Sequence, residues 1–199
     1  MRSETTIPVL KAAIQQALKA EPQLRNSQLW KNDLIDMTRT YLGIVSDLHV
    51  LKMHDAFKAQ DEALFDREAE AALEPVEMLV KVLATHDDYS LREQIKQVMK
   101  VPGTNSGTPE MIRQNCFVFG FYNSRDANLP IMRHANDTQR QWMKEGKLKI
   151  RFHEIQNLIW HGNDAKAFIQ KWMEGPMASD VVGTRADTVM LVKETLEFH

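Results

Sequence analysis

Three charged side chains recur at a spacing of three residues in the stretch LWKNDLIDMTRTYLG, at positions 29–43. This spacing places Asp33, Asp36 and Arg39 on one side of a helix, beside its apolar face. Two carboxylates so close together could form a catalytic pair, as in glycosidases. Carboxylates at this spacing are more commonly solvated or paired with a cation. We therefore predict that Asp33, Asp36 and Arg39 form a structural ion-pair network that docks this helix onto a neighbour.

Other patterns that could support chemistry are weaker. Glu74 and Glu77 share the same spacing, and we expect them to be solvated or ion-paired. No two of the seven histidines have the HExxH spacing, and the glycine-rich phosphate-binding motifs and GxSxG are absent. The only cysteine, Cys116, lies in the apolar run CFVFGFY and excludes a disulfide within the chain. We expect no catalytic residue, no metal site and no cofactor.

Basic residues gather between positions 133 and 152, with Trp142 and Phe152 among them. Basic and aromatic residues together are typical of surfaces that bind single-stranded nucleic acid. The same stretch would also form an ordinary amphipathic helix and edge strand, and the net charge of −2 argues against nucleic-acid binding. The candidates for a basic patch are Arg133, Arg140, Lys144 and Lys147.

Length and composition are typical of one soluble globular unit. The chain has 199 residues, with 25 basic and 27 acidic residues. It contains no apolar run of about 18 or more residues, so we expect no membrane contact. The first residues lack the apolar stretch of a signal peptide. A complete chain would thus be cytoplasmic, whereas a fragment of a longer protein could be secreted or lysosomal.

Helical signals dominate the chain. We predict one long helix over 27–65 with a Ser27 cap, and a following helix that Pro75 kinks or restarts. Thr5 or Thr6 and Pro8 indicate a helix start that leads to an end before Pro22. Further helices are expected over 90–100, 109–115, 131–145 and 163–175, and a last one is expected after a Thr184 cap.

These elements predict an all-α protein, an irregular bundle of about seven helices in a single domain over 1–199. The turn-rich stretch VPGTNSGTPE suggests a sub-lobe break near 101–108. The stretch GKLKIRFHE alternates apolar and basic residues, so 117–122 and 147–152 could form one small β-hairpin.

The order of several motifs resembles the C-terminal all-helical domain of the alpha-N-acetylglucosaminidase family of glycoside hydrolases. Pro22 and Leu24 match a turn that precedes the family's Asn-Asp-Leu-hydrophobic-Asp-x-x-Arg helix, here residues 32–39. The corner VLATHDDYSL and the closing stretch RADTVMLVKETLEF are also similar, with Ala186 in place of a glycine. The resemblance is good over residues 8–100 and weak over 101–180.

The resemblance implies a catalytic (β/α)8 barrel ahead of this domain, with both catalytic carboxylates on the barrel. Such a barrel needs about 250 residues and does not fit within this chain. The family also carries a sugar-facing segment with a tryptophan. Here that place holds Asn115 followed by CFVFGFYNS, so Asn115 and Phe119 are the pocket-facing candidates.

The resemblance therefore implies a non-catalytic helical domain that supports a glycosidase barrel carried elsewhere, or that associates with itself. An enzyme built from it would act on terminal alpha-N-acetylglucosamine. The alternative from another class is a stand-alone helical protein-interaction module. Binding of single-stranded nucleic acid through 133–152 is the third possibility.

Overall fold

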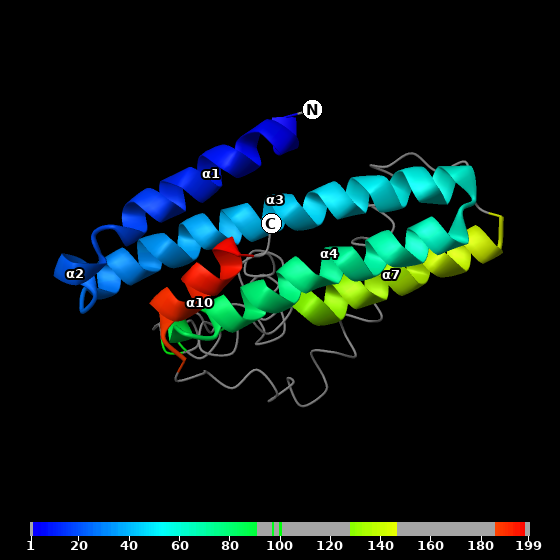
Figure 1. Cartoon of the computed structure of the whole chain (residues 1–199). Coiled ribbons are helices and arrows are strands. Elements are labelled where there is room, and N and C mark those ends of the chain that lie inside the picture. The colour runs from blue at the N-terminus through cyan, green and yellow to red at the C-terminus, as the bar shows by residue number, and fades with distance from the viewer. Residues whose placement is uncertain (1, 91–96, 98–99, 101–127, 147–185, 198–199) are drawn as a thin grey trace.

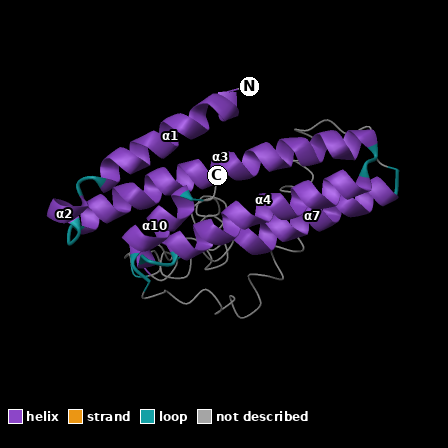
Figure 2. Cartoon of the chain, in the orientation of Figure 1, coloured by secondary structure: helices purple, strands orange, loops and turns teal. Residues whose placement is uncertain are grey.

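The computed structural model of the chain describes residues 2–90, 97, 100, 128–146 and 186–197 (Figure 1). This part of the chain forms six α-helices and one 3-10 helix and contains no strand, which confirms the all-α prediction (Figure 2). The elements are α1 (Arg2–Leu18), α2 (Glu21–Leu24), α3 (Gln28–Ala59), α4 (Glu62–Leu83), η1 (Asp87–Tyr89), α7 (Asn128–Lys144) and α10 (Thr188–Leu196). The predicted break near 101–108 and the hairpin over 117–122 and 147–152 lie outside these residues.

The two longest helices, α3 and α4, form an antiparallel hairpin that runs the length of the molecule (Figure 1). Ser27 caps α3 as predicted, because its hydroxyl accepts a hydrogen bond from the Trp30 amide. The prediction of one helix over 27–65 is wrong. Gln60 adopts the left-handed conformation with φ of 58°, and the Asp61 carboxylate then accepts from the Leu64 amide at 3.0 Å. The Asp61 cap thus starts a new helix at a point where the apolar pattern alone would predict one continuous helix.

Pro75 lies inside α4 and does not restart it, contrary to one of the two outcomes expected. The ring removes the amide that would bond the Ala71 carbonyl. Close packing of α3 holds this turn in place, and the Ser46 hydroxyl donates to the neighbouring Ala72 carbonyl at 2.9 Å. The small side chains of Ser46, Ala69 and Ala72 are buried where the two helices meet.

The first and last helices begin at other residues than the sequence predicted. Helix α1 starts at Arg2, so Pro8 lies within it rather than in its first turn. Helix α10 is capped by Asp187, whose carboxylate accepts from the amides of Val189 and Met190, and not by Thr184. A carboxylate at the N-terminus of a helix both bonds free amides and interacts favourably with the helix dipole.

Two apolar clusters fill the bundle. The first joins α1, α3, α4 and α10, and its buried members are Ile14, Trp30, Leu34, Ile35, Tyr41, Leu42, Val45, Met78, Leu79, Val82, Leu83, Val189 and Val192. The second joins α3, α4 and α7 near the hairpin turn, and its buried members are Met53, Ala56, Phe57, Phe65, Ala69, Ala135 and Met143. In the described ranges, none of the helices is both long and apolar enough to cross a membrane.

Substitutions at the hairpin turn should have opposite effects at adjacent residues. Gln60→Gly should stabilise the chain by about 0.5 kcal/mol, because glycine adopts the left-handed conformation without the clash of a Cβ atom. Ala59→Gly, at the exposed last residue of α3, should cost about 0.5–1 kcal/mol. Urea unfolding of both variants would measure the changes in the free energy of unfolding. A loss of stability in Gln60→Gly would contradict the left-handed conformation at this residue.

Candidate functional site

Asp36 connects helix α3 to the 3-10 helix that follows α4. Its Oδ1 atom accepts a hydrogen bond from the Tyr89 hydroxyl at 3.0 Å and lies 3.3 Å from an Arg39 guanidinium nitrogen. The Asp36 side chain is 54% exposed and that of Arg39 is 29% exposed, so the group lies at the surface. Asp33 is also exposed, and its side chain makes no ion pair with the described residues. The structure therefore brings together two of the three predicted residues and adds Tyr89.

The Asp36 carboxylate affects the pKa of the Tyr89 phenol. Burial, the hydrogen bond to Asp36 and the charge of Asp36 together raise the pKa of Tyr89 to about 12, and burial contributes most. A phenol that keeps its proton is the donor that Asp36 needs. The arrangement joins α3 to η1, and a phenol with this pKa keeps its proton near neutral pH.

A second pair lies between the two long helices and was not found from the sequence. His49 Nδ1 on α3 lies 2.8 Å from Glu68 Oε2 on α4, and the two side chains are 19% and 9% exposed. Because a carboxylate only accepts hydrogen bonds, Nδ1 must carry the proton. This hydrogen bond lowers the pKa of Glu68, and Arg67 and Lys52 act in the same direction.

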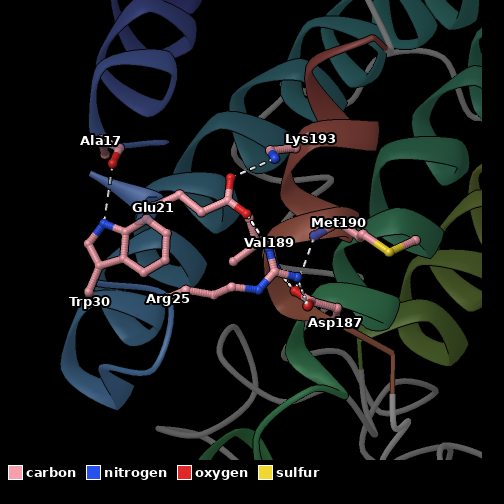
Figure 3. Close-up of polar contacts among 8 residues, drawn as sticks. All are labelled: Ala17, Glu21, Arg25, Trp30, Asp187, Val189, Met190 and Lys193. Carbon is pink, nitrogen blue, oxygen red and sulfur yellow. Dashed lines mark hydrogen bonds and ion pairs between the residues drawn. The ribbon is translucent and has the colours of Figure 1, made fainter. Parts of the chain in front are cut away.

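A third group joins the N-terminal part of the chain to its last described helix (Figure 3). Arg25, beside α2, pairs with Glu21 and places its second guanidinium nitrogen 2.6 Å from Asp187 Oδ2. Lys193 on α10 lies 2.6 Å from the other oxygen of Glu21. We call Glu21, Arg25, Asp187 and Lys193 the clamp. Its residues are separated by up to 172 positions in the sequence, so no local pattern predicts it.

Both carboxylates of the clamp are held in their charged form. The hydrogen bond from Lys193 lowers the pKa of Glu21, assisted by the charges of Lys193 and Arg25. Burial alone would raise the pKa of Asp187, but the amides of Val189 and Met190 and the charge of Arg25 together lower it. The clamp therefore remains fully charged at neutral pH.

The arginines of the predicted basic patch contact carboxylates on α4. Arg133 lies 3.0 Å from Glu77, and Arg140 lies 2.7 Å from Asp66 and 2.9 Å from Asp137. Because these cations are already paired, phosphate groups would have to compete for them. Lys144 is exposed in the last turn of α7, and Lys147 lies outside the described residues.

Asn115 and Phe119, the pocket-facing candidates, also lie outside the described residues. In the ranges that the structure covers, no three His, Cys, Asp or Glu side chains are grouped so that they could hold a metal ion. The expectation that the chain uses no metal or cofactor stays a prediction.

Comparison with known families matches residues 5–116 to the alpha-N-acetylglucosaminidase (NAGLU) C-terminal domain. The matched segment is more than half of the 199 residues. The chain belongs to this family. No curated protein and no solved structure shows significant similarity to this chain.

The NAGLU C-terminal domain match contains most of α1 and all of α2, α3, α4 and η1, and therefore both Asp36–Tyr89 and His49–Glu68. Helices α7 and α10 lie beyond it. The resemblance stated for the closing stretch RADTVMLVKETLEF thus stays a prediction. Tyr89 was part of the corner motif, but its partner lies 53 residues earlier, and only the folded chain reveals the contact.

Asp36→Asn should lower the pKa of Tyr89 from about 12 towards its ordinary value, because the phenol loses an anionic acceptor. Since folding raises this pKa, the contribution to stability is complete below about pH 10 and is lost as the pH rises through the folded value. NMR titration of ring-labelled tyrosine measures the change. Asp33→Asn, three residues away on α3, is the matched control and should leave Tyr89 unaltered.

Glu68→Gln should reduce the free energy of unfolding at pH 7 by about 1–3 kcal/mol, because His49 loses its buried charged acceptor. The pKa of Glu68 is lower in the folded chain than its ordinary value of 4.5. The difference between wild type and variant should thus be constant above about pH 5 and shrink as the pH falls through the folded pKa.

Urea unfolding of wild type and Glu68→Gln between pH 3 and pH 7 measures this difference. Glu74→Gln, at an exposed position on the same helix, should change stability by no more than about 0.5 kcal/mol. Equal effects of the two variants would show that the His49–Glu68 contact contributes nothing specific.

Proposed function

We propose that this chain is a non-catalytic helical domain that supports the catalytic barrel of a glycosidase. Membership of the alpha-N-acetylglucosaminidase C-terminal domain family is the observation that carries the proposal. The description of the family as a C-terminal domain implies a further part of the enzyme ahead of it. Substrate chemistry on terminal alpha-N-acetylglucosamine would then belong to that part.

The carboxylates of the described helices support a structural role. Asp36 accepts from Tyr89, Glu68 from His49, and Asp187 from Arg25 and two amides. A glycosidase needs two carboxyl groups that flank the scissile bond, roughly 5–9 Å apart across a pocket. Carboxylates that are bound to cations and helix ends are unsuited to that task.

The surface of the domain supports association with another protein. Three large apolar side chains are strongly exposed: Val9 at 66%, Leu29 at 73% and Met190 at 68%. Exposed apolar side chains are favourable where a partner covers them. The same side chains would serve self-association or a stand-alone interaction module, and the experiments below separate these possibilities.

The purified chain should release no chromophore from an aryl alpha-N-acetylglucosaminide above the buffer rate. Added to the separately produced catalytic barrel of a family enzyme, it should bind the barrel and raise its thermal midpoint. Activity assays measure chromophore release, calorimetric titration measures binding, and thermal denaturation measures the midpoint. Ordinary turnover by the chain alone would refute the proposal.

Substitutions of exposed residues test whether binding to the barrel uses the exposed apolar side chains. Val9→Lys and Leu29→Lys should weaken binding to the barrel if these side chains are covered, whereas Ala63→Lys, also exposed, should not. Light scattering of the chain alone over a range of concentrations tests self-association. A concentration-dependent dimer without affinity for the barrel would favour the stand-alone module instead.

A further inference from the structure

Helix α10 depends on its neighbours for its existence. It has 9 residues, fewer than the roughly 12–15 that an isolated helix needs for even marginal stability in water. Its inner side is buried through Thr188, Val189, Val192 and Thr195, and it packs on α3 and α4. Among the described residues, packing on α3 and α4 and the clamp are therefore the two sources of its stability.

The clamp is a row of alternating charges. Lys193 binds Glu21, Glu21 binds Arg25, Arg25 binds Asp187, and Asp187 bonds the positive N-terminal end of α10 (Figure 3). Removing Arg25 therefore leaves Asp187 without its cation, and removing Glu21 leaves Lys193 without its carboxylate. The row contacts α10 at both its first and its second turn.

The cations of the clamp lie at the surface, its Glu21 and Asp187 side chains are 17% and 34% exposed, and the core that it closes is buried. The side chains of Arg25 and Lys193 are 51% and 52% exposed, whereas Val189 and Val192 are 1% and 0% exposed. Exposed ion pairs are screened by salt, and buried apolar contacts are not. Salt therefore weakens one of the two sources of stability and spares the other.

We propose that α10 is a salt- and acid-sensitive latch, which opens locally and uncovers the first apolar cluster while the α3–α4 hairpin stays folded. The charged groups that face the clamp come from α2 and from α10 itself, namely Glu21, Arg25, Asp187 and Lys193. Helices α3 and α4 contribute apolar side chains, such as Leu34 and Leu83, to the first apolar cluster.

The direction of the acid response follows from the carboxylates. The pKa values of Glu21 and Asp187 are lowered from ordinary values of 4.5 and 3.8. Their contribution is therefore complete above these values and is lost as the pH falls through the lower folded values. The latch therefore stays shut at neutral pH and opens as the pH falls through the lowered folded pKa values of Glu21 and Asp187.

Amide hydrogen exchange of the full chain tests the latch. In wild type at pH 7, raising sodium chloride from 20 mM to 500 mM should speed exchange of the α10 amides several-fold and leave the α3 amides unchanged. Arg25→Gln in low salt should speed α10 exchange by about three- to tenfold and abolish most of its salt dependence. Lys193→Gln should produce a smaller effect, because Arg25 still bridges Glu21 and Asp187.

Arg133→Gln is the matched control. It removes an ion pair of similar exposure, 56% and 48%, that joins α7 to α4. It should leave α10 exchange unchanged. The proposal would be overturned if neither added salt nor Arg25→Gln changed the exchange rates of the α10 amides. Equal acceleration in α10 and α3 would also overturn it, since α10 would then open only when the whole chain unfolds.

Discussion

The packing of α3 against α4 is the contact on which the other elements depend. Helices α1 and α10 lie on this hairpin at one end and α7 lies on it near the turn (Figure 1). The small side chains of Ser46, Ala69 and Ala72 let the two helices approach closely, and large side chains such as Tyr41, Phe57 and Phe65 fill the space on either side. Close-packed interiors transmit small shifts, so the position of every outer helix follows from this hairpin.

Polar bonds at the same interface fix the register of the hairpin. Ser46 of α3 donates to the Ala72 carbonyl of α4, and His49 of α3 contacts Glu68 of α4. Apolar surfaces tolerate sliding by one turn, whereas each buried polar group loses its partner if the helices slide. The few polar contacts therefore select one alignment among several that would bury similar area.

The sequence predicts what depends on local chemistry. The Ser27 cap, the presence of a helix at α7 and the all-α class follow from side chains within a few residues of each other, although α7 begins at Asn128 and not at the predicted 131. The break at Gln60 was missed because neither glycine nor proline marks it, and the Asp61 cap that restarts the helix lies in an otherwise helical pattern. The N-cap of α10 was misplaced because Thr184 and Asp187 are both good caps, and only packing decides between them.

Partners distant in sequence could not be predicted. The spacing of Asp33, Asp36 and Arg39 indicates a charged network, but which of the two carboxylates is used depends on where Tyr89 lies after α4 has returned along α3. The family resemblance does not depend on such contacts. It was placed over residues 8–100 from the order of motifs, and the family match covers 5–116.

The two described helices beyond the family match attach to it in the same way. Helix α7 inserts Ala135 and Met143 into the second cluster and pairs Arg133 and Arg140 with carboxylates of α4. Helix α10 inserts apolar residues into the first cluster and reaches α2 through the clamp. Apolar contacts supply most of the attachment energy, while surface ion pairs add little strength but require a defined orientation. The described part of the matched segment therefore shares its apolar clusters with the later helices, and the ion pairs help to orient these helices on it.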